Sequence, residues 1–362
     1  MRYVSILVVG IFSLFFLAID CVYGEYQCTS AFCFFTMSTD THTTALDTAA
    51  LALLDNYAKN QDTLASYIVN YEEDIEIERF GTAGPNKGFH DKQARHEKSE
   101  CRYDGKRYCI RQLQWGSLIN VPKEQPMYYS ILYDGKLYVQ SNSAIVKGVK
   151  KQPSCINPHP NQALQQMVQF LNTGLLMGYM EGDSDQRIDT ILRQAKSLKL
   201  RQKQELINGS PCYVIEGITR KGKYTIWFDP EHGYNLARVV IERREGDFYL
   251  PDRPSLEKGD RLDFILQDIR FERIANRWVP MEVTAKQHWE SLIGKSNKTY
   301  HHKRTQINLN PDFTNAFIPN DIPDGNTIWV VNSTAHVPAG SNYTWKNGKP
   351  CDKQGTPLDF SE

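Results

Sequence analysis

The sequence predicts an α+β fold in which helices cover one face of a large antiparallel β-sheet. About a dozen segments with alternating apolar residues are separated by turn sequences such as Asp104-Gly105, Asp134-Gly135 and Asn208-Gly209. Helical periodicity marks residues 45–59, 162–180 and 187–198. An alternating sheet has one apolar face to bury, so about three helices are its expected cover.

The composition excludes several classes of protein. The 362 residues carry 42 Lys+Arg and 42 Asp+Glu, which argues against a dedicated binder of nucleic acid or acidic lipid. A hydrophobic content of 41% with 23% charged residues indicates a globular chain. The only long apolar run is the first one, so a polytopic membrane protein is not expected.

The first residues read as a secretory signal peptide. Arg2 supplies the charged start, Val4–Ile19 is apolar, and cleavage is expected after Gly24, which leaves an exported, soluble protein. A retained anchor is the alternative, but the run is shorter than the roughly 20 residues that span a bilayer and ends at Asp20. Lipidation at Cys21 is a third option, disfavoured by the acidic residue before it.

The remaining chain divides into three parts. Residues 25–43 are irregular, residues 44–311 form the main domain, and residues 312–362 form a C-terminal extension with one short strand at 328–331. A phase slip near Gln267-Asp268 predicts a bulge. Strands are predicted at 67–77, 107–115, 128–133, 136–140, 205–207, 212–219, 223–228, 234–243, 262–271, 278–287 and 298–309.

Export would allow disulfides, and the sequence offers one candidate pair. A two-residue turn at Asp104-Gly105 would pair Cys101 with Tyr108, whereas a three-residue turn would pair Cys101 with Cys109. We favour the second register and predict a Cys101–Cys109 bridge. No C-x-x-C pair occurs, so a structural zinc site is not expected. The cysteines left after cleavage are Cys28, Cys33, Cys101, Cys109, Cys155, Cys212 and Cys351.

Two segments carry a resemblance to a known superfamily. Gly222-Lys-Tyr-Thr-Ile-Trp-Phe-Asp-Pro-Glu-His-Gly233 and Asn276-Arg-Trp-Val-Pro-Met281, with the leader, helix and long strands, resemble periplasmic lipoprotein-localisation carriers and related envelope-stress sensors. The likeness covers about Ala45 to Leu309. It implies a curved half-barrel with helices over its mouth, in the periplasm or envelope of a Gram-negative-type bacterium. The segment Phe317–Trp345 resembles extensions of secreted planctomycete proteins.

Motifs for catalysis, cofactors or metals are not found. Residues 217–223 have the spacing of a phosphate loop, but Tyr224 stands where Ser or Thr would contact magnesium. There is no G-x-S-x-G elbow and no H-E-x-x-H pair. His301 and His302 are adjacent on a strand and so point to opposite faces, which keeps them from joining His288 in one metal site. No catalytic, cofactor-binding or metal-binding residue is predicted.

The concave face of the predicted sheet is the candidate binding surface. Either helices fill it as an ordinary core, or it leaves an apolar pocket for an acyl chain or an apolar peptide. The residues predicted to line it are Trp115, Tyr224, Ile226, Phe228, Val239, Ile241, Phe264 and Leu266.

Three functions follow, each with its own requirement. The first is an extracytoplasmic, non-enzymatic binding protein or carrier for a lipid-like or lipoprotein ligand, which needs an apolar cavity. The second is an envelope scaffold or stress sensor that binds another protein, which needs a filled interior and an exposed apolar patch. The third and most distant is a hydrolytic enzyme, which needs converging polar groups in a cleft.

Overall fold

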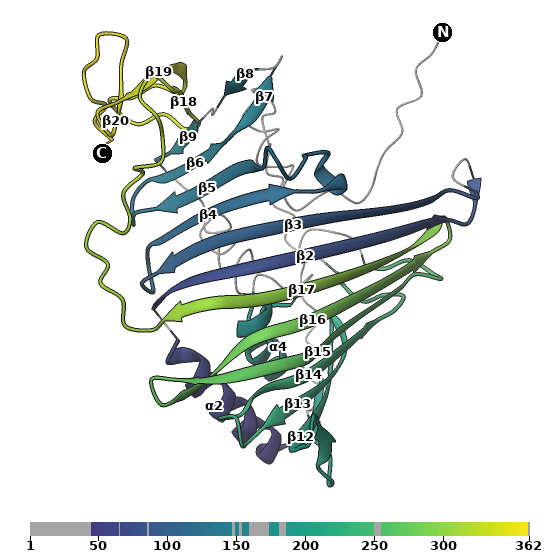
Figure 1. The fold of residues 1–362 in the computed structure, drawn as a ribbon. Coiled ribbons are helices and arrows are strands. Elements are labelled where there is room, and N and C mark those ends of the chain that lie inside the picture. Colours follow the sequence, from purple (N-terminus) through teal and green to yellow (C-terminus); the bar gives the residue numbers. More distant parts are fainter. Residues whose placement is uncertain are drawn as a thin grey trace.

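A computed structural model describes residues 45–64, 66–84, 87–146, 149–151, 154–158, 174–180, 186–249 and 255–360. Figure 1 shows a large, open, curved sheet of mostly antiparallel strands with helices on one side. The predicted α+β class with a large antiparallel sheet is therefore confirmed, and the curvature is that expected of a half-barrel. The predicted signal peptide, the segment 25–43, Cys21, Cys28 and Cys33 lie outside the described residues.

The sheet consists of two meanders joined along one seam. The first runs through β12 (Ser210–Thr219), β13 (Gly222–Asp229), β14 (Asn235–Arg243), β15 (Arg261–Ile274), β16 (Arg277–Ser291) and β17 (Gly294–Asn308). The second runs through β2 (Tyr67–Gly81), β3 (His90–Tyr103), β4 (Tyr108–Trp115), β5 (Met127–Tyr133), β6 (Tyr138–Asn142) and β9 (Ser154–Asn157). The seam is the antiparallel pairing of β17 with β2.

Short strands lie at the edge of the sheet formed by β12 of the first meander. β10 (Ser197–Leu200) and β11 (Glu205–Ile207) pair with β12, and β1 (Ala45–Leu46) runs parallel to β10. A separate hairpin is formed by β7 (Ala144–Val146) and β8 (Val149–Lys151). In β15 the register shifts between Gln267 and Arg270, where Asp268 has a φ of 55°, so the predicted bulge is confirmed.

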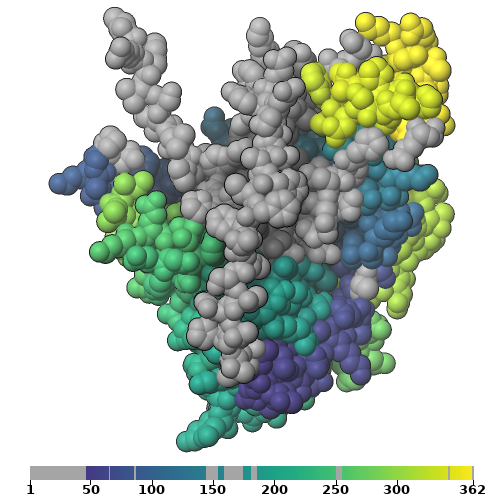
Figure 2. All heavy atoms as spheres, turned by 180° about the vertical axis from the view of Figure 1, so that it is seen from behind, coloured from purple at the N-terminus to yellow at the C-terminus, as the bar shows by residue number. Residues whose placement is uncertain are grey.

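Helix α2 (Thr48–Asp62) covers the first meander. Its start is fixed by Asp47, whose Oδ1 accepts the backbone N–H of Ala49 at 2.8 Å. Leu54 and Tyr57 are fully buried against the sheet. We call the face of the sheet that α2 and α4 cover the inner face, and the opposite face the outer face. Figure 2 shows the molecule from behind, with α2 in purple beside the teal region of α4 at one end of the inner face.

Helix α4 (Ile188–Arg193) is shorter than predicted, because Ser197–Leu200 forms strand β10 instead of a helical turn. In β10, Leu198 is buried and pairs with Gly217 of β12, so pairing at the sheet edge overrides helical periodicity there. Of the helix predicted over 162–180, the described part forms only the 3₁₀ turn η3 (Leu175–Met177).

The described part of the C-terminal extension, residues 312–360, contains three strands where one was predicted. They are β18 (Thr327–Val330), β19 (Gly340–Lys346) and β20 (Lys349–Cys351). β18 runs parallel to β9, so the extension continues the main sheet at its second edge. Its buried Val330 and Trp345 belong to a core cluster that also contains Leu132 of β5.

The predicted Cys101–Cys109 disulfide is wrong. The hairpin pairs Tyr103 with Tyr108, so its loop has one residue more than expected and Cys109 stands opposite Arg102. Cys101 therefore points to the inner face and Cys109 to the outer face, and both are free thiols. The cause is local: Asp104 Oδ1 accepts the backbone N–H groups of Lys106 (3.0 Å) and Arg107 (2.6 Å), which holds the wider loop.

Candidate functional site

The structure brings together seven of the eight residues predicted to line a ligand site. Each of the seven is 0% exposed and packs in one cluster with α2 and α4. Trp115 is not among them, because it lies on the outer face and stacks on His96 with ring centroids 5.7 Å apart. A ligand-lining role for these residues stays a prediction. The seven are Tyr224, Ile226, Phe228, Val239, Ile241, Phe264 and Leu266.

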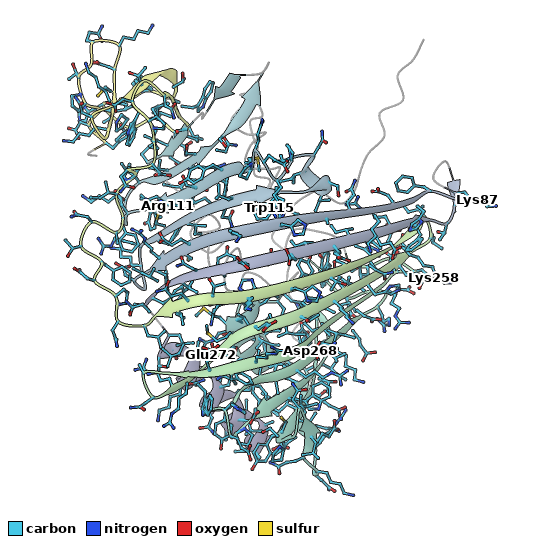
Figure 3. The ribbon with its side chains drawn as sticks, in the orientation of Figure 1. Lys87, Arg111, Trp115, Lys258, Asp268 and Glu272 are labelled. Carbon is cyan, nitrogen blue, oxygen red and sulfur yellow. The ribbon has the colours of Figure 1, made fainter. Side chains whose placement is uncertain are left out.

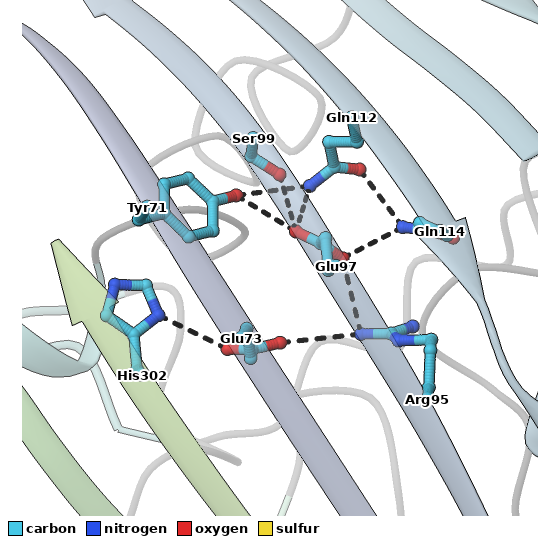
Figure 4. Close-up of polar contacts among 8 residues, drawn as sticks. All are labelled: Tyr71, Glu73, Arg95, Glu97, Ser99, Gln112, Gln114 and His302. Carbon is cyan, nitrogen blue, oxygen red and sulfur yellow. Dashed lines mark hydrogen bonds and ion pairs between the residues drawn. The ribbon is translucent and has the colours of Figure 1, made fainter. Parts of the chain in front are cut away.

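Further along the same inner face, the inward positions become polar. Strand register aligns Tyr71, Ser99 and Gln112 in one row, and Glu73, Glu97 and Gln114 in the next. Val283, in the helix-packed cluster, stands opposite His302 of β17, which shows that the two regions share one face. We call Tyr71, Glu73, Arg95, Glu97, Ser99, Gln112, Gln114 and His302 the inner polar cluster (Figure 4).

Glu97 is the centre of this cluster. Its Oε1 accepts hydrogen bonds from the hydroxyls of Tyr71 (3.1 Å) and Ser99 (2.9 Å) and from Gln112 Nε2 (2.6 Å). Its Oε2 accepts one from Gln114 Nε2 at 2.9 Å. Burial raises the pKa of Glu97, although Arg95 and the two hydroxyls act against the rise. Polar hydrogens thus surround a carboxyl group that is nearly inaccessible to water.

A second set of contacts ties β17 to β3 through Glu73. Arg95 Nη2 lies 3.5 Å from Glu73 Oε1 and 3.7 Å from Glu97 Oε2, so one guanidinium bridges the two carboxyl groups. His302 Nδ1 lies 3.4 Å from Glu73 Oε2, and its ring stacks on Tyr71 with centroids 4.8 Å apart. The cluster is therefore a connected network across β17, β2, β3 and β4 (Figure 4).

Apolar and aromatic side chains frame the network. Val69, Ile110, Tyr129 and Ile131 are buried beside it in a second core cluster. The arrangement can hold the polar part of a ligand by hydrogen bonds while its apolar part lies on the aromatic frame. Sequence reasoning missed this site because it predicted no strand at residues 90–100. The only available signal was Arg95, Glu97, Ser99 and Cys101 at every second position.

The outer face carries a groove of about 370 Å³. Its wall is ion-paired: Lys98 Nζ lies 2.7 Å from Glu72 Oε1, and the Tyr128 hydroxyl donates to Asp321 Oδ2 at 2.6 Å. Arg111, labelled in Figure 3, donates to Asn320 Oδ1. The contacts of Tyr128 and Arg111 hold the segment after β17 against the outer face.

A patch of exposed apolar side chains lies where the β2–β3 and β16–β17 hairpins meet. Phe89, Leu292 and Ile293 are 51%, 72% and 64% exposed, and we call them the hairpin-tip patch. The backbone N–H of Thr82 donates to the Ile293 carbonyl at 3.2 Å, which links the two tips. Figure 3 labels Lys87 at this end of the sheet.

Polar groups also converge at Asp229, next to a turn. Its Oδ1 accepts the Ser210 hydroxyl at 2.8 Å, and its Oδ2 lies 2.6 Å from His232 Nδ1. The serine thus faces the carboxylate instead of the imidazole, so this geometry gives the hydroxyl no histidine base.

The described residues contain neither a metal-binding group nor a membrane-spanning helix. No group of three or more His, Cys, Asp or Glu side chains is arranged to hold a metal ion. No helix in this part of the chain combines the length and apolar character needed to cross a bilayer.

Comparisons with known proteins place the chain in no family. No family model matches it, and no curated protein matches it. Among solved structures, it is similar to the Pseudomonas aeruginosa MucA/MucB complex at 10% identity, covering 72% of this chain and 100% of that one, with a TM-score of 0.23. Lipovitellin, from a study of lipid–protein interactions, follows at 9% identity, 68% and 26% coverage, and a TM-score of 0.30. The YwiB protein of Bacillus subtilis has 3% identity, 66% and 94% coverage, and a TM-score of 0.18. At these TM-scores the likenesses establish neither a common fold nor a function.

Proposed function

We propose that this protein is an exported, non-enzymatic binding protein or carrier that holds a lipid-like or acylated ligand against the inner face of its sheet. The observation that carries the proposal is the inner polar cluster, a buried hydrogen-bonding network set into an apolar wall. The predicted leader and the resemblance of residues 222–233 and 276–281 to lipoprotein-localisation carriers support an envelope location.

Burying polar groups is energetically costly. A buried amide or hydroxyl without a partner costs about 1–3 kcal/mol, and a buried charge costs more, so a sheet that needs only a core gains by filling inward positions with apolar residues. The part of the first meander beneath α2 and α4 does so, with Tyr224, Ile226 and Phe264. The second meander places Glu97, Gln112 and Gln114 at the equivalent positions. Ligand sites combine an apolar wall with a few convergent polar groups in this way.

Photocrosslinking tests the proposal. A long-chain alcohol bearing a diazirine is incubated with the purified protein, irradiated, and the labelled peptides are mapped. We expect labels on inward residues of β2 to β5 and β17, and their loss in the presence of excess unlabelled alcohol. Labels confined to β13 to β15 would show that the ligand binds at the residues predicted from the sequence and not at the inner polar cluster. Absence of competable labelling would contradict the proposed function.

The hairpin-tip patch favours a second candidate, a scaffold or sensor that binds another envelope protein. Phe89, Leu292 and Ile293 expose apolar side chains together at one end of the sheet, and a group of exposed apolar side chains is typical of a protein-binding surface. Crosslinking in intact envelopes should then give an adduct that Leu292→Ser with Ile293→Ser removes. Leu206→Ser, at a site that is 73% exposed on another strand, is the matched control and should leave the adduct intact.

A further inference from the structure

Arg304 of β17 is a buried cation that has no carboxylate partner among the residues that the structure describes. It lies two positions from His302, on the same face of the strand, and stands opposite Tyr71 of β2. Its Nη1 donates to the Pro280 carbonyl at 2.8 Å, whereas its Nε has no hydrogen-bond partner. The residue is only 3% exposed.

The neighbours of Arg304 do not neutralise it. The ionisable groups that act on the guanidinium are Tyr67 and Cys101, and no described carboxylate forms an ion pair with it. Burial lowers the pKa of Arg304 to about 10, so the side chain still carries its charge at neutral pH. Arg95 is the contrast on the same face, because it bridges Glu73 and Glu97.

Two nitrogens of the inner polar cluster also lack hydrogen-bond partners among the described residues. Arg95 Nε and His302 Nε2 are buried and form no hydrogen bond. Buried polar atoms are satisfied in the great majority of cases, so these unsatisfied nitrogens on β17 and β3, the two strands that flank β2, need an explanation. A ligand that brings acceptor oxygens and negative charge to this place would satisfy the arginine nitrogens and compensate the unpaired cation.

We propose that Arg304 binds the anionic head of the ligand, a carboxylate or a phosphate, and that the ligand is an anionic amphiphile whose chain lies on the neighbouring aromatic frame. This inference rests on the proposed function and makes its ligand class more specific. A guanidinium suits both head groups, since its fork of N–H donors matches the oxygens of either. The apolar side chains near Arg304 on this face include Tyr67, which interacts with the guanidinium, and Met281 on the paired strand β16; both belong to the second core cluster.

Binding of three amphiphiles with similar chains tests the inference: oleate, oleoyl lysophosphatidate and oleyl alcohol, each below its critical micelle concentration. We expect the parent to bind at least one anionic probe about tenfold or more tightly than the alcohol, as expected for a charge-assisted hydrogen bond. Preference for oleate assigns a carboxylate site and preference for the lysophosphatidate assigns a phosphate site. Either preference supports the inference.

Variants then locate the effect. Arg304→Met should reduce the anion preference to about onefold without weakening alcohol binding, and Arg304→Lys should keep part of it. Arg111→Met, on the outer face, is the matched control and should keep the full preference. Circular dichroism checks that each variant is folded. If Arg304→Met does not fold, the same binding measurements are made on Arg304→Gln.

Three outcomes separate the two proposals. A parent that binds the alcohol as tightly as both anions would overturn the role of Arg304 and leave the proposed function standing. A folded Arg304→Met variant that keeps the anion preference would likewise overturn the role of Arg304 and leave the proposed function standing. A parent that binds none of the three probes would contradict the proposed function itself.

Discussion

The two meanders of the sheet use the same strand geometry for different purposes. In the first, inward residues such as Ile226 and Phe264 are fully buried beneath α2 and α4 and form a solid apolar core. In the second, the inward residues include Glu97 and Gln112, which are equally buried but hydrogen-bonded. The seam passes from one to the other without interrupting the pairing. The fold therefore requires only that inward residues alternate with outward ones, and the choice of apolar or polar inward residues distinguishes the core from the candidate site.

The largest expected effect comes from a charge placed in the first meander. Ile226→Glu puts an unpaired carboxylate at a position that is 0% exposed, and we expect a loss of about 3–5 kcal/mol, enough to unfold much of a marginally stable protein. Ile218→Glu, at a neighbouring position that is 52% exposed, should be nearly neutral. Urea unfolding followed by circular dichroism measures both. A folded Ile226→Glu of nearly parental stability would show that this half is an open pocket, and the comparison would fail.

A smaller loss is expected when the centre of the inner polar cluster is removed. Glu97→Leu leaves Gln112, Gln114 and Arg95 short of an acceptor, which should cost about 2–4 kcal/mol. Glu97→Gln keeps one acceptor oxygen and should cost less. The same urea titration ranks the two variants. If the leucine variant equals the parent in stability, the network is not what holds this half together.

The third prediction concerns pH. Because burial raises the pKa of Glu97 in the folded state, the folded protein binds this proton more tightly than the unfolded chain does. The resulting contribution to stability is complete below the unfolded pKa of about 4.3 and is lost as the pH rises through the raised folded pKa. The unfolding free energy of the parent relative to Glu97→Gln should therefore fall as the pH rises. A difference that grows with pH would reverse the direction assigned to Glu97.

The smallest expected effect concerns Cys101 and Cys109, whose redox state tests the pairing register of β3 and β4. We expect peptide mapping without reductant to recover Cys101 and Cys109 as thiols, and alkylation in the native state to be slow. Burial raises the pKa of both thiols, that of Cys109 to about 11. A recovered Cys101–Cys109 peptide would mean that β4 is shifted by one residue. Gln112 and Gln114 would then leave the face of Glu97.

The sequence predicted the first meander better than the second, for physical reasons. In β13 and in the first half of β15 every second residue is apolar and points inward, so the inward face could be read directly from the sequence. In β3 both faces are polar, because Lys98 and His96 pair outward while Glu97 and Arg95 pair inward, and no hydrophobic pattern remains to be detected. Arg304 could be placed on a strand, but its missing partner depends on which residues of distant strands surround it.

Other misses came from contacts that local sequence does not encode. The hairpin after β3 is set by the side chain of Asp104, which supports a wider loop than the turn sequence alone indicated. The parallel pairing of β18 with β9 joins residues far apart in the chain, so the extension was predicted with one strand and not as a continuation of the sheet. Both features depend on interactions that exist only when the neighbouring strands are in place.

The seam between β17 and β2 also sets the order in which the chain can assemble. Each meander is built from local hairpins and can form early, but β2 must wait for β17, which is synthesised near the end of the chain. During that interval β2 is an unpaired edge, where strands of other molecules could add. Its outward residues Glu72, Asp74 and Glu76 place negative charge along this edge and so discourage self-association. Lys303 and His301 of β17 later align with Glu72 and Asp74. The charges that disfavour self-association of β2 therefore also favour its pairing with β17.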